Sequence, residues 1–191
     1  PSGIFQNNNV NIIGNGVVLD PILFMDEAKA LEQSGTDIKK ILKISKKTHL
    51  IMPTHRRLDA AQEKAKGDSK IGTTGKGIGP TYTDKISRNG LRVGDIFSNF
   101  EQKYAIAKAK HIATLTQLGG DTDVAELEAQ WMQAIDYIKG FDIIDSEYVV
   151  NGLLAQGKKV LCEGAQGTML DVDFGSYPFV TSSNTITAGA C

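Results

Sequence analysis

The chain has 191 residues, enough for one ordinary domain with its own core. Apolar residues make up 41% and charged residues 23%, which is typical of globular proteins, and the formal net charge is −1. This balance argues against nucleic acid or a membrane surface as a partner, and no apolar run approaches the roughly 18 residues of a membrane span. Two cysteines make no disulfide framework, so we expect a cytoplasmic protein.

The two ends of the sequence are unusual. The chain begins at Pro1 without an initiator Met, and it stops at Cys191 in a small-residue segment with no closing helix or strand. We therefore expect an internal fragment of a longer protein.

The first predicted elements are a strand region and a helix. Residues 10–19 are rich in β-forming side chains, and Gly14–Gly16 marks a turn. Asp20 suits the N-cap of a helix and Pro21 its first position. Gly35 then supplies a C-terminal stop.

The next stretch leads into a long irregular segment. Residues 38–44 are ambiguous, 48–52 favour a short strand and 53–66 favour a helix. Residues 67–92 are predicted to be mostly loop, with a possible helical turn over 84–88. A long loop inside a compact domain is usually functional or disordered.

Two helices are predicted over residues 100–118 and 123–138, and together they could form a helical subdomain on the sheet. The second has an apolar stripe typical of a helix that faces a core. Its members are Val124, Leu127, Trp131, Ala134, Ile135 and Ile138.

The last part of the chain has an α/β pattern. Asp145 or Ser146 caps a helix that ends at Gly157, and residues 158–162 (KKVLC) indicate a buried strand. This strand leads into the glycine-rich residues 163–168. In α/β sheets, ligands bind at the carboxyl ends of strands.

The glycine-rich run over residues 72–80 suits a phosphate cradle, because glycines let backbone amides approach an anion. It is not a Walker A loop, since Gly77 follows Lys76 where Ser or Thr is required and Lys70 occupies the first Gly position. It is not a dinucleotide fingerprint either, because Pro80 stands at the third Gly. A flexible surface loop is the alternative, and composition leaves both open.

Two cations follow this run. Lys85 and Arg88 are three residues apart, so they would share a face of a helical turn and could meet a phosphate or carboxylate. Without further context, a solvated charged turn is the favoured reading.

Polar residues also follow the predicted strand over 158–162. Gln166 could bond a base edge or ribose, and the hydroxyl-rich residues 181–185 could bind phosphate or cap a helix. Asp171 and Asp173 could suggest a metal site, but no further ligand completes a set, so a structural role is favoured.

The three histidines are scattered along the sequence. None of His49, His55 and His111 has a Cys, Asp or Glu partner at ligand or triad spacing. We expect packing or surface roles for all three.

Taken together, the motifs resemble the adenylosuccinate synthetase family. The matching runs are PSGI at Pro1, IGNGVV at Ile13, IGTTGKGIGPTYTDKISRNGLRVGD at Ile71 and EGAQGTMLDVDFGSYPFVTSSNT at Glu163. The resemblance implies that the chain is the central part of a single α/β domain. The full fold would be a P-loop-NTPase-like, mostly parallel sheet whose N- and C-terminal parts are missing here.

The resemblance also implies a chemistry. The family is a homodimeric ligase of purine (AMP) biosynthesis that joins IMP and L-aspartate to form adenylosuccinate, with GTP and Mg²⁺. GTP phosphorylates the 6-oxygen of IMP, and aspartate then displaces the phosphate. Such transfers need positioning and charge neutralisation more than a protein nucleophile.

Site residues are implied only where this sequence matches the family's motifs. Thr74 and Thr181 are implied to bind the IMP phosphate region and Gln166 the IMP base. Arg88 resembles the residue that a dimer partner donates to the neighbouring IMP phosphate, where a guanidinium suits a phosphate. Lys85 matches a signature lysine and is the candidate catalytic residue.

Lys76 falls in the loop near the family's aspartate site. The family's phosphate loop, Mg²⁺ ligands and general-acid His would lie upstream of Pro1, and its guanine-recognition motif beyond Cys191. We therefore expect no metal ligands in this chain and no activity from it alone. The alternative is a non-catalytic nucleotide-binding or dimerisation module; an unrelated P-loop GTPase is disfavoured by the failed Walker pattern.

Overall fold

The structure is a computed structural model that describes residues 1–6 and 8–190. Five short strands form two parallel sheets in the described part of the chain. The larger sheet has the order β1-β3-β5, from β1 (Asn11–Ile13), β3 (Leu42–Ser45) and β5 (Asp142–Ile144). The smaller sheet pairs β2 (Val18–Leu19) with β4 (His49–Leu50). Parallel strands with intervening helices confirm the predicted α/β class.

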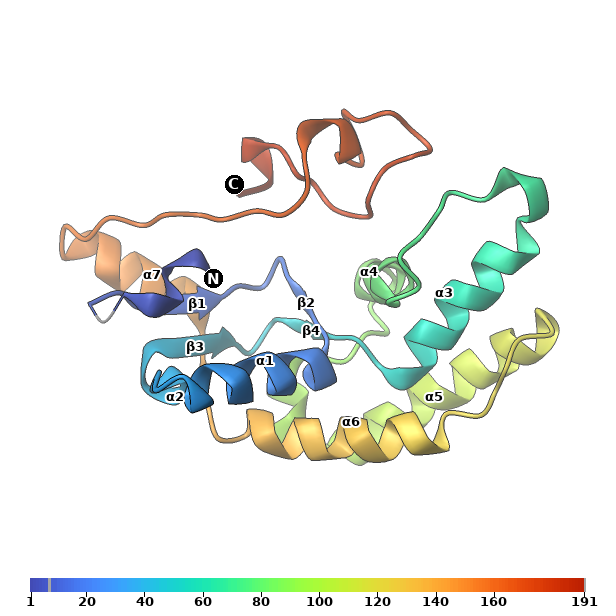
Figure 1. Ribbon diagram of the computed structural model, residues 1–191, viewed down its shortest axis with the longest axis horizontal. Coiled ribbons are helices and arrows are strands. Elements are labelled where there is room, and N and C mark those ends of the chain that lie inside the picture. Colours follow the sequence, from blue (N-terminus) through green and yellow to red (C-terminus); the bar gives the residue numbers. More distant parts are fainter. Residues whose placement is uncertain (7, 191) are drawn as a thin grey trace.

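Helices α1 (Pro21–Gln33), α2 (Ile38–Ile41) and α6 (Ala125–Ile138) lie on one side of the strands, and α3 (Pro53–Ala65) and α5 (Phe100–Gln117) extend beyond them (Figure 1). Helix α1 packs beside α6, and α3 packs beside α5. The short helix α2 precedes β3, so the ambiguous stretch contains both a helix and a strand. None of the described helices combines the length and apolar composition needed to cross a membrane.

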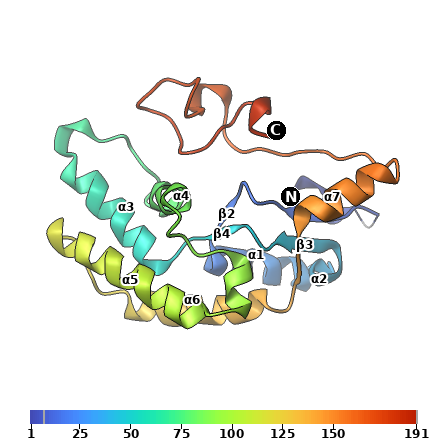
Figure 2. The ribbon, with the colours of Figure 1, turned by 180° about the vertical axis from the view of Figure 1, so that it is seen from behind.

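The opposite side carries the last part of the chain. Helix α7 (Ser146–Ala155) follows β5, and the segment after it passes over the strands before it folds into short turns. The view from behind shows the same separation, with α6 and the C-terminal turns on opposite sides of the strands (Figure 2).

The core lies between the larger sheet and helix α6. Ile44 in β3 and Ile138 in α6 are fully buried members of one apolar cluster. The Trp131 indole stacks near Tyr104 and donates to the Ile51 carbonyl at 2.8 Å. The predicted stripe is buried as expected except at Leu127, which is half-buried.

Local sequence rules account for the start of α1. The Asp20 carboxylate accepts hydrogen bonds from the amides of Ile22 at 3.1 Å and Leu23 at 3.3 Å, and Pro21 opens the helix. The N-cap prediction is therefore confirmed.

The prediction of a mostly irregular segment over 67–92 was wrong in one part. Helix α4 covers Ile78–Ser87, ten residues, and begins well before the predicted turn. Gly77 precedes it in the left-handed conformation, with φ of 79°. Pro80 is tolerated because the first turn of a helix has no intrahelical partner for its amides.

The predicted buried strand over 158–162 was also wrong. These residues form neither a helix nor a strand, and Leu161 is 88% exposed. A β-rich composition reports fit to a paired, half-buried surface. Among the described residues, no strand pairs with this segment, so its apolar side chains stay in solvent.

Candidate functional site

The glycine-rich loop before α4 is tied to helix α3 at both ends. The Gly72 amide donates to the Glu63 carboxylate at 2.7 Å, and the Gly77 amide donates to the Asp59 carboxylate at 2.9 Å. These two amides of the predicted cradle are therefore engaged by carboxylates. Thr74 and Lys76 lie between the two anchors and are exposed.

Gly77 is the point where only glycine fits. Its φ of 79° is left-handed, and a Cβ at this position would lie 2.9 Å from the Arg56 backbone nitrogen and from the His55 carbonyl carbon. The close contact packs the start of α4 directly against the first turns of α3.

Helix α4 also holds the turn between β1 and β2. The Tyr82 hydroxyl donates to the Gly16 carbonyl at 2.8 Å, and the Lys85 ammonium donates to the Asn15 carbonyl at 3.0 Å. Burial lowers the pKa of Lys85, and the charge of Arg92 adds to this effect. The candidate catalytic lysine is thus engaged with a backbone carbonyl.

Arg88 lies just after the last residue of α4. It is exposed and left-handed, with φ of 65°, and serves as the helix C-cap. Residues 79 and 88 are separated by about 13 Å along a helix that rises 1.5 Å per residue. Arg88 therefore lies at the opposite end of α4 from the glycine-rich loop.

Asp171 organises the C-terminal segment. Its buried carboxylate accepts hydrogen bonds from backbone amides and one side-chain amide, at 2.6 to 3.5 Å. The donors are Asp173, Phe174, Asn184, Thr185 and Ile186. Burial would raise the pKa of Asp171, but the amides lower it to about 2. These bonds support the structural role favoured from the sequence.

The same segment brings Ser182, the residue after Thr181, close to the start of α4. The Thr181 amide donates to the Leu170 carbonyl at 2.9 Å. The neighbouring Ser182 hydroxyl lies 3.5 Å from the point that a Cβ on Gly79 would occupy. Gln166 is exposed in the turn before Leu170, in a left-handed conformation with φ of 69°.

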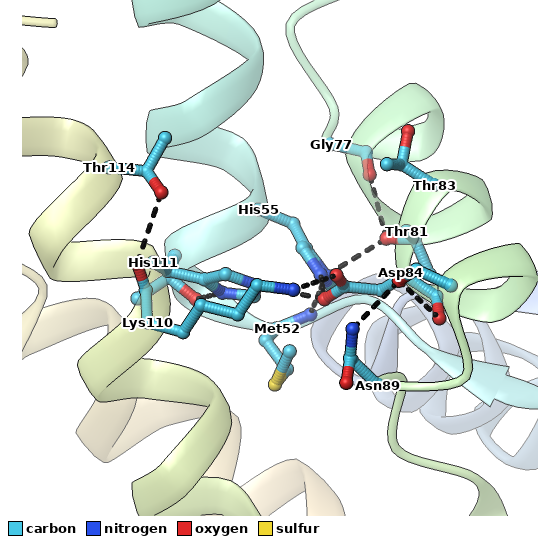
Figure 3. A network of polar contacts seen from close by, with 12 residues as sticks. Met52, His55, Gly77, Thr81, Thr83, Asp84, Asn89, Lys110, His111 and Thr114 are labelled. Carbon is cyan, nitrogen blue, oxygen red and sulfur yellow. Dashed lines mark hydrogen bonds and ion pairs between the residues drawn. The ribbon is translucent and has the colours of Figure 1, made fainter.

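A buried polar network joins three helices beneath this region (Figure 3). One carboxylate oxygen of Asp84 in α4 lies 3.0 Å from Nε2 of His55 in α3 and 2.8 Å from Nε2 of His111 in α5. All three side chains are buried. Spacing along the sequence did not reveal this acidic partner, and the burial of both histidines agrees with the expected packing role.

The hydrogen bonds define the protonation state of this network. The Met52 amide donates to Nδ1 of His55 at 3.0 Å, so its Nε2 carries the hydrogen and donates to Asp84. Burial would raise the pKa of Asp84, but hydrogen bonds from His111 and His55 outweigh it and lower that pKa. Burial lowers the pKa of His55, so an ionised carboxylate faces a neutral imidazole.

These three residues are also close enough to consider a metal ion. Their ligand atoms lie within 4.8 Å of one another. A metal on Nε2 of His55 would move the ring hydrogen to Nδ1, where it would face the Met52 amide hydrogen. Mg²⁺ also prefers oxygen ligands. The cluster suits a hydrogen-bonded network and does not fit a Mg²⁺ site.

Comparisons with known proteins agree over the whole chain. Residues 1–191 match the family described as adenylosuccinate synthetase. The chain is 69% identical over 191 residues to adenylosuccinate synthetase of Bacteroides fragilis and 70% identical to that of Phocaeicola vulgatus. In both cases all of the chain is covered, but it spans only 45% of the relative's length.

A solved structure gives the same result. The fold resembles that of a fully ligated adenylosuccinate synthetase from Plasmodium falciparum, with a TM-score of 0.85 and 35% sequence identity. The match covers 99% of this chain and 44% of the solved one.

Proposed function

The chain belongs to the adenylosuccinate synthetase family, and from this premise we propose that the full-length protein joins IMP to L-aspartate with hydrolysis of GTP. The product would be adenylosuccinate, in AMP biosynthesis, formed through 6-phosphoryl-IMP in the cytoplasm. The observation that carries the proposal is the family match over residues 1–191. The motif runs at Ile71 and Glu163 are the segments that resemble the family's IMP site.

We assign the IMP phosphate to the region where the C-terminal segment meets α4. Thr181 lies beside Ser182, which approaches Gly79 in the first turn of the helix. A helix N-terminus favours an anion, and a threonine hydroxyl can donate to a phosphate oxygen. Thr74 would reach the same phosphate from the open part of the glycine-rich loop. Gln166 would bond the base.

Arg88 is proposed to serve the neighbouring subunit of a homodimer. It is exposed and lies at the far end of α4 from the proposed phosphate site of its own chain. A guanidinium offers paired donors that match two phosphate oxygens. These features support a contact across the dimer interface with the partner's IMP.

Two lysines complete the proposed site. Lys76 is exposed in the glycine-rich loop, where its ammonium could meet a carboxylate of aspartate. Lys85 is the candidate catalytic lysine, and its bond to the Asn15 carbonyl supports a role in holding the turn after β1 beside the substrate.

The chemistry requires the 6-oxygen of IMP to be held in line with a donor phosphoryl group. GTP, bound with Mg²⁺, would supply that group. We assign no GTP or Mg²⁺ ligand to the described residues, so their part is to bind and orient IMP. We propose that residues of about 100–138 form a helical subdomain that supports the helices of this site.

The test is turnover by the full-length protein. With IMP, aspartate, GTP and Mg²⁺, we expect adenylosuccinate by chromatography, and no product when either IMP or GTP is omitted. The 191-residue chain alone should give none. Absence of product from the intact protein would refute the ligase proposal. IMP binding or dimerisation without turnover would favour a non-catalytic module.

A further inference from the structure

The side chains of His55, Asp84 and His111, which we name the histidine–aspartate network, connect three helices that are far apart in sequence. His55 is 0% exposed, His111 3% and Asp84 5%. A buried carboxylate is costly unless hydrogen bonds compensate for lost water. Here two imidazole N–H groups supply that compensation, and the Lys110 ammonium lies farther away at 3.8 Å.

The outer atoms of the network are engaged as well. Nδ1 of His111 lies 2.7 Å from the Thr54 hydroxyl, and Nδ1 of His55 lies 2.9 Å from the Thr81 hydroxyl. The single hydrogen of the Thr81 hydroxyl is donated to the Gly77 carbonyl at 2.7 Å, so this hydroxyl packs beside Nδ1 of His55 without donating to it. Each hydrogen bond has a direction, so the network accepts one orientation of α4. A purely apolar contact would tolerate several.

Two faces of α4 depend on that orientation. Thr81 and Asp84, three residues apart, point into the network, while Tyr82 and Lys85, also three apart, point to the turn after β1. Successive helix residues are rotated by about 100°, so a rotation by one position would break both sets of bonds. The network on one face therefore fixes the position of the turn on the other.

Asp84 also closes the end of the helix. Its backbone carbonyl accepts the amides of Asn89 at 2.9 Å and Gly90 at 3.1 Å. This closure surrounds Arg88, whose left-handed backbone directs the chain out of the helix. Asp84 therefore connects the buried network, through its side chain, with the C-terminal end of α4 at Arg88, through its backbone carbonyl.

We infer that Asp84, held by His55 and His111, is a positioning residue that sets α4 for IMP binding. It acts through Lys85, Arg88 and the start of α4, and it does not touch the substrate. This inference rests on the proposed function of the site. It assigns the buried histidines a role in substrate affinity in addition to packing.

The test uses the full-length protein with two variants of Asp84. Asp84→Ala removes the acceptor, and Asp84→Asn keeps one oxygen that can accept. Ser146→Ala is the matched control, because Ser146 is equally buried and donates to the Ser45 hydroxyl at 2.9 Å, outside α4. The readouts are thermal midpoint, IMP affinity by calorimetry, KM and kcat, and hydrogen exchange of the amides of residues 78–87.

We expect Asp84→Ala to weaken IMP affinity by about tenfold, with a matching rise in KM for IMP, because α4 would hold its binding-competent position only about one tenth of the time. Exchange should increase in α4 and in the turn at Gly14–Gly16 but not in α6. Asp84→Asn should recover part of the affinity. Ser146→Ala should lower only the thermal midpoint.

A fall in thermal midpoint with unchanged IMP affinity, KM and α4 exchange would overturn the inference and leave a purely structural network. If Asp84→Ala does not fold, His111→Phe removes one hydrogen-bond donor to Asp84 at nearly constant volume. Its IMP affinity, KM and α4 exchange, compared with its thermal midpoint, then test the inference in the same way. If the wild-type protein binds no IMP, the proposed function fails. In that event, α4 exchange in the variants still tests positioning: no local increase in α4 would contradict it.

Discussion

Helix α4, together with the glycine-rich loop before it, and the C-terminal segment over residues 158–190 both carry glycine-rich and polar sequence, yet their structures are stabilised differently. Helix α4 is fixed by directional bonds to α3, α5 and the turn after β1. The C-terminal segment is mostly exposed and is organised locally around Asp171. Site residues on α4 should therefore be held by the core, whereas Thr181 and Gln166 should depend on one local carboxylate.

The largest effect is expected where α4 packs against α3. Gly77→Ala should lower the free energy of unfolding by about 2–4 kcal/mol, because a left-handed alanine is strained and its Cβ would meet backbone atoms at 2.9 Å. Gly75→Ala is the control, since it is also left-handed but has no atom within 4 Å of the added Cβ. Denaturant titration should show a clearly smaller loss for the control. Equal losses would mean that α3 and α4 are loosely packed.

Lowering the pH should reduce the free energy of unfolding, because protonation of His49 is unfavourable in the folded protein. Burial, followed by the charges of Lys85 and Arg92, lowers the pKa of His49 to about 4. The unfolded chain, with an ordinary histidine pKa near 6.5, takes up the proton first. The stability that depends on a neutral His49 is therefore fully present above about pH 6.5 and is lost as the pH falls to about 4. Over that range the free energy of unfolding should decrease by up to about 3 kcal/mol.

Denaturant titrations between pH 7 and pH 4 check this expectation. Replacing His49 by Gln should flatten the pH dependence relative to wild type. A slope that is identical in both proteins would show that His49 is not held neutral by burial.

The C-terminal segment should respond locally. Asp171→Ala removes the acceptor of several backbone amides, so limited proteolysis within residues 158–190 should accelerate by about tenfold or more, with little change in global unfolding. Asp173→Ala is the control, because Asp173 bonds the Asn184 side chain through an exposed carboxylate. Cooperative loss of the whole fold in Asp171→Ala would mean that the two regions are not independent.

The smallest effect is expected in the segment that was predicted to be a strand. Leu161→Ser in the 191-residue chain should change the free energy of unfolding by less than about 0.5 kcal/mol, because the side chain is 88% exposed. Leu42→Ala, at a fully buried position, should cost about 2–5 kcal/mol. A loss at Leu161 near the upper figure would indicate that residues 158–162 pair as a buried strand after all.

Local rules predicted the features that depend on neighbouring residues. The cap at Asp20 and the stripe around Trp131 follow from short-range chemistry and helical spacing, and both are present. The family resemblance supplied the candidate site, because the long motif runs identify it without any knowledge of contacts.

Features that depend on distant partners could not be predicted from the sequence. His55 and His111 meet Asp84 across 29 and 27 residues, a separation that matches no ligand or triad spacing. Residues 158–162 have the composition of a strand, but composition does not reveal whether a neighbouring strand is available. Helix α4 is stabilised by the packing of Gly77 and Asp84 against α3. A prediction that treats glycine only as a loop-forming residue does not include such contacts.

The most direct test of the proposed site is a calorimetric titration of the full-length protein with IMP. The account predicts saturable binding that Thr181→Ala weakens by about tenfold, the usual cost of one hydrogen bond to a charged group, while Ser146→Ala leaves it unchanged. Equal affinity in wild type and Thr181→Ala, or no binding by wild type, would contradict it.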